Sequence, residues 1–215
     1  MPDLKAFPPQ GMLHEGWIAQ VDDYALDCGW ICQGRYLLVA DVAGGLSAFA
    51  GDSGERIWRK QGLHQEGLLA VSIHPDGDRF ATSGQDGCVL IWDSNQGDLM
   101  HSIQPGKAWV EHLAWSADGD HLAVAASKTV HIYTGDGEER WRTEEHPSTV
   151  SAIAWSRPDE LATASYGQVC FHDITRQQVG QKLQWQGSLI SMVLSPGGDI
   201  VACGSQDNSV HFWRR

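Results

Sequence analysis

Residues 74–93 read HPDGDRFATSGQDGCVLIWD, and this stretch decides the fold. A Pro-Asp-Gly turn is followed by a short apolar run, a second turn at Asp86 and Gly87, and an apolar run ending in Trp92 and Asp93. Short apolar runs bounded by Gly and Asp turns are typical of antiparallel strands. The stretch therefore predicts two neighbouring strands of one sheet.

The turn that opens this stretch returns along the chain at intervals of about 40 residues. A fixed period of this size indicates one supersecondary unit that cannot bury its apolar face without neighbours. Each clear copy lies between two apolar runs, and a fainter copy places Trp30 and Ile31 before the run YLLVAD at 36–41. The clear copies are HPDG at 74–77, SADG at 116–119, SRPD at 156–159 and SPGG at 195–198.

The second unit shows most clearly how many strands one repeat holds. Its apolar runs are separated by PDGD, GQDG and SNQGD, which carry the Gly or Asp that tight turns need. Four strands per repeat is the pattern of a β-propeller blade, and no stretch has helical periodicity. The chain is therefore predicted to be all-β, with strands in the second unit at residues 68–73, 79–83, 88–93 and 99–103.

From His64 through HPDG to SGQDGCVLIWD, the second unit resembles the WD-repeat (WD40-type) β-propeller family, although Leu63 stands where the family has Gly. The fourth unit, ending in VCFHD at 169–173, and the fifth, with SQDNSVHFW at 205–213, follow the same pattern. The resemblance covers roughly residues 17–215. It implies a propeller of four-stranded antiparallel blades that acts as a protein–protein interaction scaffold or assembly subunit without catalysis.

The number of units leaves two architectures open. Five units are present, and the fifth stops after its third strand. The segment GWIAQV at 16–21 has strand character, and in the family an N-terminal strand typically completes the last blade. The alternatives are a closed five-blade ring or an incomplete seven-blade propeller whose open edge is covered by a partner or a further chain. Residues 1–15 are expected to be a flexible leader and residues 16–215 the propeller.

Composition restricts the partners and the compartment. The formal net charge of -12 repels a phosphate backbone, so the partners are predicted to be proteins and not nucleic acid. No apolar run is long enough to span a membrane, and the N-terminus does not read as a signal peptide. Five cysteines without a CxxC pair fit a reduced, cytoplasmic location.

One set of polar residues in the second unit combines the residue types of a catalytic triad. It contains His64, Thr82 or Ser83, Asp86 and Trp92. In the family these positions form a buried structural network, and Trp has no role in a nucleophilic triad. We therefore predict no catalytic residues. Other units lose members of the network: the fourth keeps His146 and Ser165 but has His172 in the Trp position.

Two alternative functions arise from other features. Ten histidines, together with Cys170 and His172 on one strand face, suggest an accessory protein that binds a metal or small ligand near the propeller channel. Neither metal-ligand spacing nor a phosphate-binding glycine loop is present, so no metal or cofactor is predicted. The segments 48–59 and 132–142 resemble quinoprotein-type propeller enzymes, which implies that Trp58 and Trp141 dock between blades.

Aromatic residues in loops are the candidates for partner binding, because Trp and Tyr dominate binding hot spots. Trp109 lies beside Lys107 in the loop that enters the third unit, Tyr166 in the shortened turn of the fourth, and Trp185 before the fifth. All are expected on one face of the propeller. The alternative is that each aromatic side chain fills a gap left by a missing His-Asp network.

Overall fold

The structure is a computed structural model that describes residues 16–215. These residues form nineteen strands and no helix, so this part of the chain holds no helical segment able to cross a membrane. The predicted leader at 1–15 lies outside the described residues.

The strands form five antiparallel sheets, here called blades one to five. Within each blade the strands follow one another in sequence order, so every connection is a hairpin. Blade one contains β1 (Ala25–Ile31), β2 (Tyr36–Asp41), β3 (Leu46–Ala50) and β4 (Arg56–Lys60). Blade two contains β5 (Leu68–Ile73), β6 (Arg79–Gly84), β7 (Val89–Asp93) and β8 (Leu99–Ile103).

The remaining blades repeat this order, except that blade five has three strands. Blade three contains β9 (Val110–Trp115), β10 (His121–Ala126), β11 (Thr129–Thr134) and β12 (Glu139–Arg142). Blade four contains β13 (Ala152–Arg157), β14 (Glu160–Ser165), β15 (Gln168–Asp173) and β16 (Gln178–Gln184). Blade five contains β17 (Leu189–Leu194), β18 (Ile200–Ser205) and β19 (Val210–Arg214).

The predicted turn chemistry explains the strand boundaries in blade two. Gly77 and Gly87 have φ values of 70° and 74°, which lie in the left-handed region that favours glycine. The amide of Gly77 donates to the carbonyl oxygen of His74 at 2.8 Å and closes the first turn. The four predicted strands of this unit are confirmed to within one residue at each end.

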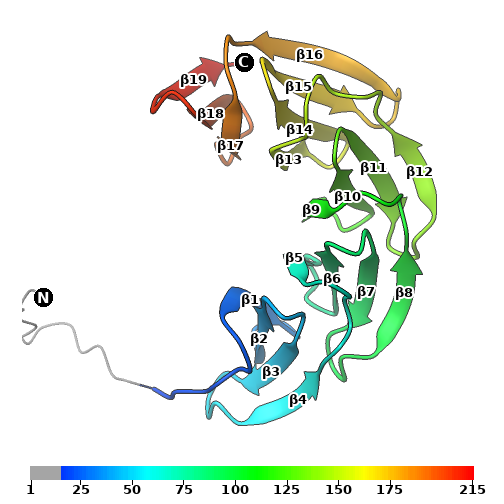
Figure 1. The fold of residues 1–215 in the computed structure, drawn as a ribbon, viewed down its shortest axis with the longest axis vertical. Coiled ribbons are helices and arrows are strands. Elements are labelled where there is room, and N and C mark those ends of the chain that lie inside the picture. Colours follow the sequence, from blue (N-terminus) through cyan, green and yellow to red (C-terminus); the bar gives the residue numbers. More distant parts are fainter. Residues whose placement is uncertain (1–15) are drawn as a thin grey trace, which may run out of the picture.

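The five blades stand side by side in an arc (Figure 1). The first strands β1, β5, β9, β13 and β17 line the inner side, and β4, β8, β12 and β16 form the outer rim. The arc stays open between blades one and five. Of the two architectures left open by the sequence, residues 16–215 therefore do not form the closed five-blade ring.

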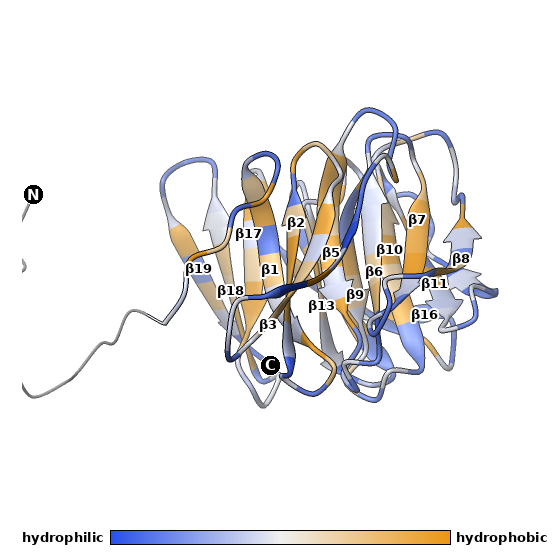
Figure 2. Cartoon of the chain, turned by 90° about the horizontal axis from the view of Figure 1, so that it is seen from below, coloured by the Kyte–Doolittle hydropathy of each residue, from blue (hydrophilic) through white to orange (hydrophobic). Residues whose placement is uncertain are grey.

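The hydrophobic core lies between adjacent blades. In the first interface, Ile31 and Leu38 of blade one share a cluster with Phe80 and Trp92 of blade two. Three further clusters join the later blades in the same way. Seen from below, apolar residues follow the strands and polar residues gather in the loops at both ends (Figure 2). Each sheet thus buries its faces against its neighbours.

Residues 16–21 have strand character in the sequence, and the family resemblance left open that they complete the last blade of a closed ring. They form no strand, and Trp17 lies against blade one. The indole Nε1–H of Trp17 donates to the carbonyl oxygen of Gly51 at 2.9 Å, in the turn after β3. Trp58 of β4 makes the matching bond to the Ser94 carbonyl oxygen, in the turn after β7, at 3.2 Å. Trp17 therefore packs on blade one in the same way that Trp58, from the outer strand of blade one, packs on blade two.

Replacing Phe80 with alanine tests the interface between blades one and two. Phe80 is fully buried, so Phe80→Ala should lower the free energy of unfolding by about 3–5 kcal/mol. Leu99→Ala is the control, because Leu99 on the outer rim is 52% exposed and its loss should change stability by less than about 0.5 kcal/mol. Chemical denaturation followed by tryptophan fluorescence measures both. Equal effects would contradict the core described above.

Candidate functional site

The polar residues singled out in blade two meet around one buried hydroxyl group. The loop between β4 and β5 supplies His64, β6 supplies Thr82, and β7 supplies Trp92. The Nε1–H of Trp92 donates to Thr82 Oγ1 at 2.9 Å, and His64 Nε2 lies 2.9 Å from the same oxygen. Ser83, the alternative hydroxyl, instead donates to the carbonyl oxygen of Val110 in blade three at 2.9 Å.

The carboxylate of Asp86 holds the other side of the His64 ring. His64 Nδ1 lies 3.1 Å from Asp86 Oδ1, and the amides of Gln65 and Cys88 also donate to this carboxylate. Burial opposes ionisation of Asp86, but these hydrogen bonds outweigh it and lower its pKa. Because Thr82 is fully buried and Trp92 is 2% exposed, no substrate can reach the shared hydroxyl. The arrangement ties two strands, the loop between β4 and β5 and the turn between β6 and β7 together.

Blade four contains a variant of this network built on two histidines. His146 Nε2 lies 2.8 Å from Thr163 Oγ1, and His172 Nε2 lies 3.0 Å from the same oxygen. Sequence reasoning assigned Ser165 to this unit. Its Oγ has no hydrogen-bond partner, because Thr163 holds the position that corresponds to Thr82. Thr163 could have been predicted from the sequence, because it stands at the same position of its strand as Thr82.

The protons in this network can be placed from its hydrogen bonds. The Lys128 carbonyl oxygen can only accept, so His146 Nδ1, 3.0 Å away, carries a proton. Burial lowers the pKa of His146. Burial also lowers the pKa of His172, and repulsion between the two rings when both are protonated lowers it further, to about 4. Both rings are therefore neutral at pH 7. Thr163 then donates to His146 Nε2 and accepts from His172 Nε2–H, which leaves His172 Nδ1 as a bare acceptor.

Blades three and five depart further from the pattern. Tyr133 fills the Trp position of blade three, and burial raises its pKa to about 12. In blade five, Trp185 packs on His211 with ring centroids 3.6 Å apart. The indole nitrogen of Trp185 is buried without a hydrogen-bond partner. In blade five this aromatic packing lies beside a different polar set, in which Ser209 Oγ contacts both Asp207 Oδ1 and His211 Nε2.

The predicted partner-binding residues lie in loops, and two of these loops are hydrogen-bonded to each other. Tyr166, which is 55% exposed, lies in the turn between β14 and β15. The carbonyl oxygen of Gly167 accepts from the Trp185 amide at 2.9 Å, so the Tyr166 turn and the Trp185 loop are adjacent. Next to them is a hollow of about 450 Å³ lined by Tyr166, Gln186 and Asp207, among others.

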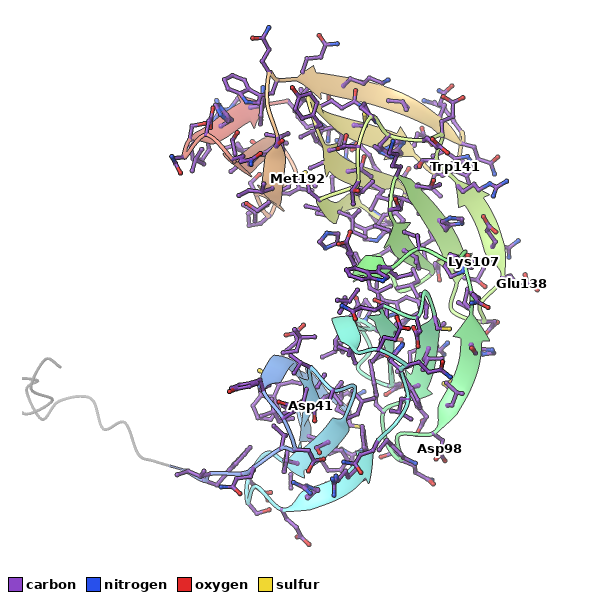
Figure 3. The ribbon with its side chains drawn as sticks, viewed as in Figure 1. Asp41, Asp98, Lys107, Glu138, Trp141 and Met192 are labelled. Atoms are coloured by element: carbon purple, nitrogen blue, oxygen red, sulfur yellow. The ribbon has the colours of Figure 1, made fainter. Side chains whose placement is uncertain are left out.

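Trp109 and Lys107 belong to a different loop, which links β8 to β9 (Figure 3). Both side chains are exposed, and Trp109 keeps 52% of its surface accessible. No hydrogen bond joins this loop to the Tyr166 turn within residues 16–215. The structure thus brings Tyr166 and Trp185 together and places Trp109 at the entrance to blade three.

One ion pair between blades four and five escaped sequence reasoning. The guanidinium of Arg215 donates to both carboxylate oxygens of Glu160, at 2.7 and 2.8 Å, and stacks 3.7 Å above the Phe171 ring centroid. These hydrogen bonds from Arg215 hold the pKa of Glu160 below its usual value. No motif marks either residue, since the contact depends on how neighbouring blades meet.

The alternative functions rested on possible metal ligands and on the tryptophans Trp58 and Trp141, and the structure shows where these residues lie. Among residues 16–215, no three His, Cys, Asp or Glu side chains come together as a metal site. Trp58 stacks on Phe80 of the next blade, and the Trp141 ring centroid lies 5.8 Å from that of His172. Both tryptophans therefore dock between blades.

The repeats match a known family. The model of the family described as "WD domain, G-beta repeat" (WD40) matches residues 59–93, 97–134 and 179–214, about half of the chain. This chain belongs to the WD-repeat family. Blades two and three account for the first two matches, and the third runs from β16 into blade five.

Several curated proteins resemble this WD-repeat chain. The small ribosomal subunit protein RACK1 of Schizosaccharomyces pombe is 26% identical over 70% of this chain. The anaphase-promoting complex subunit cdc20 of Dictyostelium discoideum is 25% identical over 70%. The beta-1 subunit of a guanine nucleotide-binding protein from Homarus americanus is 27% identical over 68%. The aligned regions span only 38%, 33% and 45% of these relatives.

Solved structures agree on the fold. A chain in the crystal structure of the mitotic checkpoint complex superposes with a TM-score of 0.81 at 20% identity, covering 92% of this chain and 63% of that one. The β-propeller domain of Cps50 (Swd1) from Myceliophteria thermophila gives 0.77 at 15% identity, covering 91% and 66%. At these identities the likeness shows a WD-repeat propeller fold.

Mild acid should destabilise the protein through the blade-four histidines. The pKa of His172 is about 4 in the folded chain and 6.5 when unperturbed. Between these two values His172 is protonated in the unfolded state but neutral in the folded state. The contribution of neutral His172 to the free energy of unfolding is therefore complete above pH 6.5. It is lost as the pH falls towards 4, by about 3 kcal/mol in all. Denaturant titrations between pH 7 and 4.5 measure it.

His172→Trp provides the comparison, because indole does not titrate and can donate to Thr163 as Trp92 donates to Thr82. The variant should show a flatter dependence of unfolding free energy on pH. Tyr133→Trp, at the corresponding position of blade three, should keep the wild-type slope. If all three proteins lose stability equally, the neutral state assigned to His172 is wrong.

Proposed function

We propose that this WD-repeat chain is a non-catalytic protein–protein interaction scaffold or assembly subunit. The observation that carries the proposal is the division between buried and exposed groups. The residues with catalytic character, such as His64 and Thr82, are buried in networks between strands. Large aromatic side chains, by contrast, are exposed in loops on a rigid framework, which is where binding usually occurs. The names of three relatives, a ribosomal subunit protein and two complex subunits, support membership of assemblies.

Two loop surfaces are the proposed partner contacts. The first contains Trp109 with Lys107, and the second contains Tyr166 with Trp185. The rings of Trp109 and Tyr166 are exposed, whereas Trp185 is half-buried and packs against the core cluster between blades four and five. Exposed aromatic rings contribute large contact areas at low entropic cost, and they rank high among hot-spot residues. The hollow beside Tyr166 gives the second surface a concave site for a partner side chain.

The open edge of blade five is a third proposed contact, covered by further four-stranded blades of a partner or of a longer polypeptide. Residues at the corresponding positions of other blades are mostly covered, but four apolar side chains of β17 and β19 are exposed. They are Ile190 at 59%, Val193 at 64%, Val210 at 60% and Phe212 at 70%. At the other end of the arc, Trp17 holds the position of an outer strand of a preceding blade. Exposed apolar surface of this kind marks an interaction site.

The proposed location is the cytoplasm, and the proposed partners exclude nucleic acid and membranes. The net charge of -12 disfavours binding to phosphate groups and anionic lipids. All five cysteines are free thiols, three of them buried, which is consistent with a reducing compartment. Burial raises the pKa of Cys170 and Cys203, so these thiols resist ionisation.

Removing the loop aromatics should abolish partner binding without unfolding the chain. Trp109→Ala and Tyr166→Ala, singly and together, should reduce recovery of specific partners at least tenfold, since hot-spot truncations cost about 2 kcal/mol or more. Quantitative mass spectrometry of co-purified proteins measures recovery, with circular dichroism as the folding check. Leu99→Ala is the matched control, because Leu99 is equally exposed (52%) but lies on the outer rim. Unchanged recovery in both variants would refute these surfaces.

The uncovered flank should make the isolated 215-residue chain self-associate. Phe212→Asp places a charge in the apolar flank and should shift the chain towards monomer in analytical ultracentrifugation. Leu99→Asp adds the same charge to the outer rim and should leave the distribution unchanged. A wild-type chain that stays monomeric at high concentration would show that this flank needs no cover.

A further inference from the structure

Three loops at the junction of blades four and five enclose the hollow beside Tyr166. They are the turn between β14 and β15, the loop between β16 and β17, and the turn between β18 and β19 (Figure 1). The volume of about 450 Å³ lies within the range of about 300–1,000 Å³ typical of ligand sites. The side chains of Tyr166, Gln186, Gln206 and Asp207 on the lining are all exposed, so a ligand can reach each of them.

Hydrogen bonds fix the three loops to one another. The Gly167 amide donates to the Gly187 carbonyl oxygen at 2.9 Å, and the Gln206 amide donates to the Ser188 carbonyl oxygen at 3.0 Å. The Ser205 hydroxyl donates to the same Ser188 oxygen at 3.2 Å. The hollow is thus formed before a ligand arrives, which reduces the entropic cost of binding.

One unpaired negative charge belongs to this hollow. Among the described residues that line it, Asp207 is the only charged one. Its Oδ1 accepts from the Ser209 amide at 3.1 Å and from the Ser209 hydroxyl. These hydrogen bonds lower the pKa of Asp207, so the carboxylate is ionised at pH 7. Within residues 16–215, no Lys, Arg or His side chain forms an ion pair with it.

The chain itself shows which group suits an aromatic ring beside a carboxylate. The guanidinium of Arg215 stacks over the Phe171 ring and donates to both carboxylate oxygens of Glu160. Its Nε–H donates to the carboxamide oxygen of Gln181 at 2.9 Å. One aromatic ring, one carboxylate and one carboxamide thus hold a planar cation.

The hollow offers the same three kinds of group without a cation among them. Tyr166 supplies the aromatic ring, Asp207 the carboxylate, and Gln186 and Gln206 the carboxamides. A guanidinium suits this set better than an ammonium, because it is planar, packs flat on an aromatic ring and directs five N–H donors at surrounding oxygens. The lining therefore favours arginine over lysine.

We propose that the hollow beside Tyr166 binds an arginine side chain of a partner protein. The guanidinium packs on the Tyr166 ring and donates to the Asp207 carboxylate, and the carboxamide oxygens of Gln186 and Gln206 accept its remaining N–H groups. This inference rests on the proposed scaffold function, because it names the partner side chain that the surface at Tyr166 and Trp185 recognises.

Two blocked amino acids that differ in charge test the proposal on the wild-type chain. N-acetyl-L-arginine methylamide should shift the amide resonances of Gly167, Gln186 and Gln206 saturably, with a dissociation constant on the order of 1–10 mM. The citrulline counterpart carries a neutral urea of similar shape and should bind roughly fivefold more weakly. NMR titration at about 0.15 M salt, which screens long-range attraction to the acidic chain, measures both. Equal affinities, or no saturable shift at these residues, would overturn the proposal.

The lysine counterpart distinguishes a fit to guanidinium from attraction of any cation. It carries the same charge as the arginine probe but has no planar group to pack on Tyr166. It should therefore bind roughly threefold more weakly than the arginine probe. Equal or tighter binding of the lysine probe would overturn the assignment to arginine.

Variants locate the binding. Asp207→Asn keeps the shape of the side chain but removes its charge, so it should abolish the preference for the arginine probe over the citrulline probe. Tyr166→Leu should weaken binding of the arginine probe roughly two- to fivefold. Asp199→Asn is the matched control, because Asp199 is also exposed, accepts from a serine hydroxyl and forms no ion pair, but lies at the other end of β18. A preference that survives in Asp207→Asn, or disappears in Asp199→Asn, would refute the site.

Recovery of partner proteins separates this inference from the scaffold function itself. Asp207→Asn should lower, by roughly fivefold, the recovery of those partners that Tyr166→Ala loses, whereas Asp199→Asn should not. If Tyr166→Ala loses partners and Asp207→Asn keeps them, the scaffold surface stands but the arginine site fails. If both variants keep every partner, the surface itself is refuted, and the inference with it.

Discussion

Every sheet in this chain depends on the sheet beside it. A blade exposes apolar side chains on both faces, and only a neighbouring blade can cover them. The contacts are directional as well as apolar: Trp58 donates to the Ser94 carbonyl oxygen of the next blade, and Trp155 donates to the Ala114 carbonyl oxygen of the preceding one, at 2.9 Å. These bonds fix how far one sheet turns against the next. The arc and its loops follow from that repeated interface.

The sequence predicted what the repeat controls. Strand order, the turn glycines and the strands of blade two were readable because local chemistry and periodicity agree there. The positions of His64 and Trp92 relative to Thr82 follow from the same pattern. Between Thr82 and Ser83 the sequence could not choose, because adjacent residues on a strand point to opposite faces and both faces are buried. In blade four the error was of another kind: Ser165 lies on the same face of β14 as Thr163, two residues further along the strand.

Contacts between blades were harder to predict. The segment at 16–21 has the composition of a strand, but strand formation needs a sheet edge to pair with, and composition does not report one. The position of Trp17 against Gly51, and the pairing of Arg215 with Glu160, depend on where neighbouring blades meet in space. The loop aromatics could be named from sequence, but the exposure of Trp109 and Tyr166, the partial burial of Trp185 and the adjacency of Tyr166 and Trp185 required the structure.

The three-stranded blade has a mechanical consequence. In a one-dimensional array each unit is held by its own bonds and by its two neighbours, so opening starts where fewest of these exist. Blade five lacks both a fourth strand and, within the described chain, a neighbour on one side. Besides its packing, blade five is held to blade four by the bonds of Arg215 to Glu160 and Gln181 and by the Ser151 hydroxyl, which donates to the Leu189 carbonyl oxygen. Under load or heat, residues 16–215 on their own would open first at blade five, while the middle of the arc holds its shape longest.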